Sequence, residues 1–166
     1  ASAGVGSQPH VALEAWARRL GIKLTHIPYK TNPSPDVMSG VVSLYLEAST
    51  TAIPSILGKR IKALAVSGSE RIPALPDVPT MQEAGVPGYN ASIWLGLLAP
   101  AGTPRDVVMK LNAEIAKVLI SADTKKELYA AGVEADLSSP EALNTLMVQE
   151  LDRWGKVIKD AGITMQ

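Results

Sequence analysis

The sequence predicts an α/β fold built on a parallel sheet. Short apolar stretches rich in β-branched residues alternate with short helical stretches in the first half of the chain. Such alternation is typical of parallel strands joined by helices, and not of a sandwich or a bundle. With 46% hydrophobic and 19% charged residues, the chain has enough apolar side chains to fill a core. After residue 100 the pattern becomes mostly helical.

The composition excludes several classes of function. The 166 residues include 16 basic and 16 acidic side chains, so the formal net charge is zero. Because such a chain has no long-range electric field to attract phosphates, we do not expect nucleic acid or an anionic membrane as its main partner. No cysteine is present, which removes disulfides, thiolate metal sites and cysteine nucleophiles. No apolar run approaches the ~20 residues that span a bilayer, so no membrane insertion is expected. The opening residues do not resemble a signal peptide.

The first half contains two kinds of element. Helices are indicated where apolar residues recur with helical spacing, and strands where β-branched and apolar residues alternate or run together. We expect helices over residues 9–20, 36–39 and 50–57, and strands over residues 23–29, 41–46 and 61–67.

Residues 69–88 have a different character. Prolines at every third position from Pro73 to Pro79 favour an extended polyproline conformation. Thr80 and Glu83 have the spacing of a capping box, and Gly85 follows as a helix terminator. We therefore expect one short helix at this point.

The second half is expected to be helical apart from two short strands. A strand over residues 92–99 leads to Thr103 and Pro104, which supply a cap and a first-position proline for a helix. Apolar residues along one face of each helix need a covering partner. The remaining elements are a helix reaching residue 119, a helix over 122–131, a strand over 133–136 and a helix from Pro140 to Gly162.

The first candidate site is the turn Gly4-Val5-Gly6-Ser7, which leads into a helix. Such a turn leaves backbone N–H groups unpaired at the positive end of a helix dipole, where they hold carboxylate or phosphate. Pro9 stands where a dinucleotide fingerprint requires its third glycine, and the phosphate-loop lysine is absent, so a small anion is expected. A strand-to-helix turn capped by Ser7 explains the same residues equally well.

The second candidate site is Glu47-Ala48-Ser49-Thr50, which follows an expected buried strand. Ligands of open parallel sheets lie outside the carboxyl ends of strands. Glu47 would accept hydrogen bonds from a ligand amine or hydroxyl, and the two hydroxyls would donate to carboxylate oxygens. The alternative is that Thr50 or Thr51 caps a helix and Glu47 is solvated.

Metal-ligating and catalytic residues are not indicated. His10 and Glu14 stand four residues apart, which suits two metal ligands on one helix face, but no third ligand is evident. His26 is interpreted as a strand histidine with a satisfied hydrogen bond. The sequence has no nucleophile elbow and no acid pair with glycosidase spacing. We therefore expect no enzyme activity, no metal and no cofactor.

Several motifs together carry a family resemblance over nearly the whole chain. The sequence resembles the substrate-binding receptors of tripartite tricarboxylate transporters, the Bug or TctC-type extracytoplasmic receptors. The matching segments are RIPALPDVPT at 71–80 followed by EAG at 83–85, GVGS at 4–7, HIPYK at 26–30, KALAV at 62–66, WLGL at 94–97, APAGTP at 99–104 and RWGKVIK at 153–159.

The resemblance implies a two-lobed, periplasmic-binding-protein-like (type II) receptor that binds a small carboxylate and delivers it to membrane permease subunits. The ligand would be a di- or tricarboxylate or an amino or hydroxy acid. Residues 1–90 would form the second lobe, and residues 91–166 the crossover strand and C-terminal helices of the first lobe. The protein would be periplasmic, its signal peptide lying outside this chain. The ligand-binding residues would be Gly4, Val5, Gly6, Ser7, Glu47, Ala48, Ser49 and Thr50.

The chain departs from the family in three places. It is expected to begin inside the second lobe, so that the first part of the first lobe, with its own ligand loop, is absent. Residues 31–34 replace a longer, glycine-containing loop. Glu47 stands where the family favours Asp, and its extra methylene predicts a preference for acids bearing an amine or a hydroxyl over a plain dicarboxylate.

Other classes of function remain open on the sequence. A ligand-sensing effector domain of a transcription regulator has a similar two-lobed architecture but would need a DNA-binding module, and none is visible. A small α/β enzyme would need convergent acids in a pocket. As a receptor fragment, the chain offers one wall of a cleft, so we expect weak ligand binding and contact between copies through the helices after residue 104.

Overall fold

The fold is known from a computed structural model, which describes residues 1–164. The helices lie where the sequence predicts them, to within two residues at each end. Local signals fix them: Pro140 begins the last helix, where Ser139 accepts from the N–H of Ala142 at 3.1 Å, and Gly162 ends it at a φ of 65°. The helices are α1 (Gln8–Arg19), α2 (Ser34–Met38), α3 (Ser49–Leu57), α4 (Arg105–Leu119), α5 (Ala122–Ala130) and α6 (Pro140–Ala161).

The predicted strands do not form ladders in the described residues. Pairing there is limited to two isolated bridges, Ser2 with Pro28 and Val66 with Thr80, both parallel. The prediction of strands over 23–29, 41–46, 61–67, 92–99 and 133–136 is therefore wrong as secondary structure, although the direction of pairing is as expected. A strand needs a hydrogen-bonded neighbour along its length. These segments lack one: residues 92–100, for instance, are all exposed.

Two further expectations concern the proline-rich segment. Thr80 and Glu83 form the predicted capping box, with Glu83 Oε2 accepting from the Thr80 N–H at 2.8 Å and Thr80 Oγ1 accepting from the Glu83 N–H at 3.1 Å. The short helix expected there does not form: residues 81–85 are turns, the Ala84 N–H donates to the Thr80 carbonyl at 2.9 Å, and Gly85 then reverses the backbone at a φ of 98°. The polyproline expectation is wrong, since Leu75 and Val78 close two tight turns by donating to Ile72 and Leu75.

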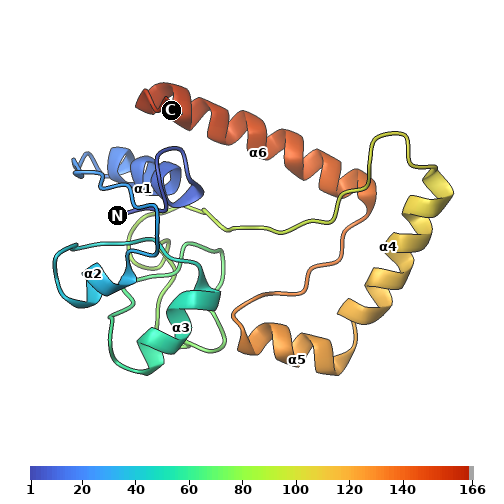
Figure 1. Ribbon diagram of the computed structural model, residues 1–166, viewed down its shortest axis with the longest axis horizontal. Coiled ribbons are helices and arrows are strands. Elements are labelled where there is room, and N and C mark those ends of the chain that lie inside the picture. Colours follow the sequence, from blue (N-terminus) through green and yellow to red (C-terminus); the bar gives the residue numbers. More distant parts are fainter. Residues whose placement is uncertain (165–166) are drawn as a thin grey trace.

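The chain forms a compact N-terminal unit and an open C-terminal arm (Figure 1). After Ala91 an extended segment leads away from the unit to α4, α5 returns toward α3, and α6 passes back to pack on α1. The buried core lies in the N-terminal unit, where Ala12, Val86, Tyr89 and Ala91 pack together. No residue of α4, α5 or α6 is buried among those described.

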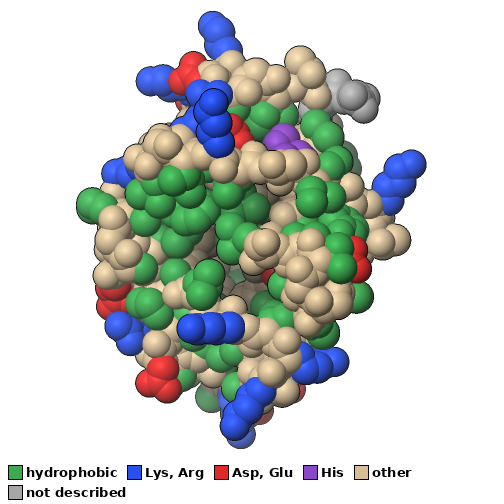
Figure 2. Space-filling view, turned by 90° about the vertical axis from the view of Figure 1, so that its left-hand side faces the viewer, with side chains coloured by type: hydrophobic (Ala, Val, Ile, Leu, Met, Phe, Trp, Pro, Cys, Tyr) green, Lys and Arg blue, Asp and Glu red, His purple; other side chains and the backbone are tan. Residues whose placement is uncertain are grey.

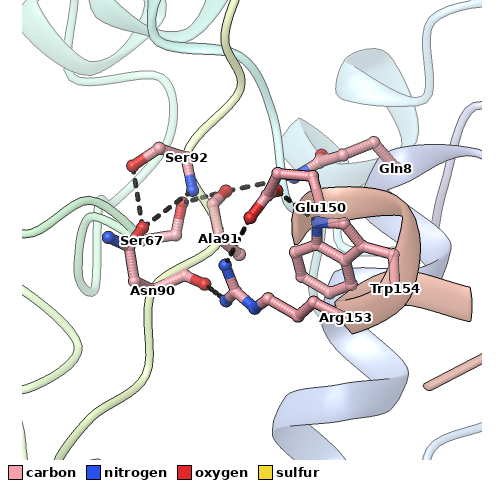
Figure 3. Close-up of polar contacts among 8 residues, drawn as sticks. All are labelled: Gln8, Ser67, Asn90, Ala91, Ser92, Glu150, Arg153 and Trp154. Carbon is pink, nitrogen blue, oxygen red and sulfur yellow. Dashed lines mark hydrogen bonds and ion pairs between the residues drawn. The ribbon is translucent and has the colours of Figure 1, made fainter. Parts of the chain in front are cut away.

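The far end of α6 is tied to the N-terminal unit at the start of the crossover (Figure 3). The Arg153 guanidinium donates to the Asn90 carbonyl and lies over the Trp154 ring, 4.6 Å from its centroid. Trp154 packs against the core and donates through Nε1 to Glu150 at 2.6 Å. Beside them, Gln8 donates to the Ala91 carbonyl at 3.0 Å. The segment where the chain leaves the unit is therefore held by both α1 and α6.

Candidate functional site

The first predicted turn is present, but three of its amides have internal partners. Positive φ angles at Gly4 (119°) and Gly6 (75°) fold the backbone back on itself. As a result, the Gly4 N–H donates to Ser2 Oγ at 3.2 Å, the Gly6 N–H to His10 Nδ1 at 3.1 Å and the Ser7 N–H to the Gly4 carbonyl at 3.3 Å. The expectation that these amides are free for an anion is wrong.

Other N–H groups of this turn are not engaged. Within residues 1–164 the structure gives no protein acceptor to the backbone N–H of Val5, Gln8 or His10. The expected Ser7 cap is also absent, because its hydroxyl donates to the Gly4 carbonyl at 2.7 Å. The first turn of α1 therefore keeps donors for an anion, although fewer than the sequence predicts.

In the second predicted segment, two side chains are engaged in internal contacts. Glu47, half-buried, accepts from the Ser34 hydroxyl at 2.9 Å, which holds the loop before α2 against it. Ser49 donates through Oγ to the Gly132 carbonyl at 2.8 Å, which fixes the end of α5 to the start of α3. Ala48 is the N-cap residue of α3 and contributes backbone only.

Thr50 remains the exposed member of this segment. Its hydroxyl does not cap α3, which lacks a side-chain cap. Within the described chain, the N–H groups of Ser49 and Thr50 have no protein acceptor. The second segment thus resembles the first: both offer the amides of a helix N-terminus.

The two segments start from neighbouring backbone. The terminal ammonium of Ala1 donates to the Leu44 carbonyl at 2.6 Å. Ala1 and Leu44 each lie three residues before a predicted site segment. Figure 2 shows the face of the molecule that carries the N-terminal unit, which is hollowed at its centre. Hydrophobic side chains surround the hollow, a histidine is visible above it, and Lys and Arg side chains lie mainly at the periphery.

Sequence reasoning did not find a histidine cluster beneath the first turn. His10 and His26 stack with ring centroids 3.6 Å apart and planes 6° from parallel. His26 Nε2 lies 2.6 Å from Ser2 Oγ, which confirms that this histidine is satisfied. His26 is far from Ser2 and His10 in sequence, and the pairing of Ser2 with Pro28 brings it beside them. No spacing rule could have signalled them.

The electrostatics of the pair favour neutral rings. Burial lowers the pKa of His10, against a weaker raising effect of Glu14. Burial, the neighbouring His10 and the terminal ammonium all lower the pKa of His26. Among residues 1–164 no group of three His, Cys, Asp or Glu side chains is placed to hold a metal ion.

Two open cavities lie away from the predicted residues. An open cavity of about 490 Å³ separates α1 from α6 and is lined by Arg18, Arg19, Arg153 and Trp154, among others. A second of about 440 Å³ lies beside the basic turn at Lys59. Neither includes a residue of the two predicted segments.

The architecture is that of a solute-binding protein. The chain is similar to the solved structure of R. palustris Rpa4515 with adipate, with 35% identity and a TM-score of 0.83; the match covers 96% of this chain and 54% of that chain. It is similar to the periplasmic binding protein BugD with 33% identity and a TM-score of 0.78, and that match covers 97% of this chain and 55% of BugD. It is also similar to MatC from Rhodopseudomonas palustris with bound malate, with 32% identity and a TM-score of 0.77; the match covers 92% of this chain and 54% of MatC. The chain therefore has the α/β fold of about half of a type II periplasmic binding protein.

The particular family follows from the sequence match. Residues 1–163 match the tripartite tricarboxylate transporter family receptor, TctC, and the chain belongs to this family, as its motifs predict. Family members are periplasmic solute-binding proteins. None of the helices within residues 1–164 combines the length and apolar character that crossing a membrane requires.

Curated relatives come in two lengths. A protein from the tcbD-tcbE intergenic region of Pseudomonas sp. (strain P51) is 40% identical over 161 residues, which cover 95% of this chain and 48% of that protein. One from the clcB-clcD intergenic region of Pseudomonas knackmussii is 33% identical, and the match covers 94% of both chains. The chain thus spans about half the length of the first relative and nearly all of the second.

Proposed function

We propose that the chain is the second-lobe part of an extracytoplasmic receptor that binds a small carboxylate in the periplasm and delivers it to the permease subunits of a tripartite tricarboxylate transporter. Membership of the TctC family is the observation that carries this proposal. Two similar proteins hold adipate and malate, which supports a carboxylate ligand. The comparisons give no support to a transcription regulator, and the known relatives are receptors and not enzymes.

The proposed lobe boundary lies near residue 90. Residues 1–90 would be the second lobe, and residues 91–166 would be the crossover and the helices of the first lobe. The buried core ends at Ala91, and the next nine residues are all exposed, which supports this division.

The proposed ligand site consists of the two helix N-termini. Within the segments 4–8 and 48–50, the carboxylate would accept hydrogen bonds from the amides of Val5, Gln8, Ser49 and Thr50, which have no protein acceptor within residues 1–164. Glu47 would act at the rim, where its contact with Ser34 orients the loop before α2. The Glu47 carboxylate would favour a ligand that carries an amine or a hydroxyl, because these groups donate hydrogen bonds to it.

Titration of the ¹⁵N-labelled chain with malate tests the site. We expect weak binding, in the millimolar range, with amide shifts confined to residues 4–8 and 48–50, because one lobe leaves the ligand exposed on one side. Dimethyl malate, which has no charge, should leave these amides unchanged. Shifts at Arg18 and Arg153 in place of the two turns would refute this site.

Matched glycine variants separate the turn from general damage. Gly6→Ala places a Cβ on a backbone with a φ of 75° inside the site, and Gly40→Ala does so at 79° in a remote turn. The malate-induced shifts should disappear in the first variant and persist in the second. Equal responses in both would contradict the assignment of the turn.

The exposed helices support contact between copies of the chain. Leu111 and Val118 of α4 and Val148 and Leu151 of α6 are each more than half exposed. Covering such apolar side chains is favourable, so we propose self-association through these helices. Sedimentation velocity should show the weight-average mass rising with concentration. A single monomeric species at high concentration would contradict this proposal.

A further inference from the structure

The histidine cluster and the glycine turn share hydrogen bonds. Ser2 is completely buried, and His10 is 9% exposed. The turn presents the Gly6 N–H to His10 Nδ1 at 3.1 Å and the Gly4 N–H to Ser2 Oγ at 3.2 Å. Both acceptors are side-chain atoms, so each of these two amides is held by a group that is able to change its bonding without unfolding the backbone.

The geometry defines the tautomer of neutral His10. An N–H group donates to His10 Nδ1, so this nitrogen has no proton and the neutral ring carries its proton on Nε2. The Ser2 hydroxyl donates to the Gly4 carbonyl at 2.9 Å, and it contacts His26 Nε2 at 2.6 Å. When the hydroxyl proton lies on the Gly4 carbonyl, the His26 nitrogen is the donor to Ser2 Oγ; with the other tautomer of His26, Ser2 donates to the ring. Protonation of His26 would keep this contact, whereas protonation of His10 would abolish its bond to Gly6.

Few charged groups act on the pair. Glu14, one turn along α1, favours a proton on either ring, and the terminal ammonium of Ala1 disfavours one on His26. Burial lowers the pKa of both histidines. Since the stacked rings lie 3.6 Å apart, a proton on one disfavours a proton on the other. The pair therefore takes up its first proton at a lower pH than a free imidazole would, and the second proton is disfavoured by the first.

We propose that His10 is a positioning residue that holds the Gly6 amide away from the anion site while neutral and releases it when protonated, so that carboxylate binding at the turn is coupled to uptake of one proton. This inference rests on the proposed function. A proton on Nδ1 faces the Gly6 N–H, and two donors cannot bond to each other. The amide then turns outward, and the imidazolium adds a positive charge beside it.

The sign of the pH dependence follows from linkage. The bound carboxylate raises the proton affinity of His10, so by reciprocity the proton raises the affinity for the carboxylate. Binding should therefore tighten as the pH falls through the His10 titration, by at most about tenfold per pH unit for one linked proton. Protonation of the ligand itself would weaken binding in acid, which is the opposite sign.

The first experiment follows the chain without ligand by ¹⁵N NMR between about pH 5 and 8. The Gly6 amide should titrate in step with the His10 ring, and His10 should be the Nε2–H tautomer at the high end. His10→Asn retains an acceptor near the Nδ1 position but does not titrate, so the Gly6 amide should become independent of pH. A Gly6 amide that stays constant while His10 titrates would overturn the proposal.

A matched variant addresses the other ring. His26→Gln keeps a donor for Ser2 Oγ and removes the stacked neighbour. The Gly6 amide should still follow the titration of the His10 ring. A Gly6 titration that disappears in this variant would assign the effect to His26 and overturn the role of His10.

The second experiment measures proton uptake by calorimetry with malate in two buffers of different ionisation enthalpy. Uptake should approach one proton in the unchanged chain and vanish in His10→Asn. Malate binding with the same pH profile in both chains would refute the proton coupling but not the proposed function. A normal Gly6 titration without any response of the turn to malate would refute the malate site and leave the His10 contact standing.

Discussion

Replacing Gly132 with alanine is expected to detach the end of α5 from α3. Gly132 has a φ of 75°, and a Cβ at this position would lie 2.6 Å from Ile53 Cδ1 and 3.0 Å from Ser49 Cβ. The isoleucine methyl is able to rotate away, but the serine Cβ is fixed by the backbone of α3. We expect the free energy of unfolding to fall by about 2–3 kcal/mol, the sum of a left-handed alanine and a steric overlap.

Urea unfolding and amide exchange measure this effect, and Gly102 provides the control. Gly102 has a similar φ of 85°, but a Cβ there would meet nothing within 4 Å. Gly102→Ala should therefore cost only the backbone term, about 1 kcal/mol. Exchange in α5 should accelerate in Gly132→Ala alone, because the Ser49 bond to the Gly132 carbonyl is lost. Equal destabilisation by both variants would show that the contact with α3 contributes nothing.

Stability should decrease in alkali because of Tyr89. Its hydroxyl is buried in the N-terminal core and donates to the Ala12 carbonyl at 2.9 Å. Burial raises the pKa of Tyr89 from 10.0 to about 12, against a lowering effect of Arg153. Between these two values the unfolded chain releases the phenol proton and the folded chain keeps it. The free energy of unfolding should therefore fall by about 2 kcal/mol as the pH rises through this range.

Comparison with Tyr89→Phe isolates this contribution from that of other groups. The variant should lose about 1 kcal/mol at neutral pH, because the Ala12 carbonyl loses its partner. Its stability should then decrease less steeply above pH 10 than that of the unchanged chain. Tyr129→Phe, at a ring that is 40% exposed on α5, should leave the slope unchanged. Parallel pH profiles of the Tyr89→Phe variant and the unchanged chain would contradict the role of the buried phenol.

The candidate site was predictable only in part. The sequence indicates two turns that lead into helices, and both helices begin there, as α1 and α3 do. It could not show that His10 and Ser2 accept from two of the turn amides, or that Ser49 bonds to Gly132 across 83 residues. Gly132 comes from a distant part of the chain, whereas Ser2 and His10 lie within four residues of the amides they bind, through side-chain acceptors that no capping or turn rule specifies.

Helix positions, the capping box at Thr80 and Glu83, and family membership were all determined by the sequence. Each depends on residues a few positions apart, or on motifs that are read directly. Only the tertiary structure decided that the extended segments of the described residues pair at two isolated bridges, that the histidines stack, and that Ser49 bonds to the Gly132 carbonyl. The physical reason is the range of the interaction. A helix closes its hydrogen bonds within four residues, whereas extended backbone and buried polar groups depend on partners that folding must bring from far along the chain.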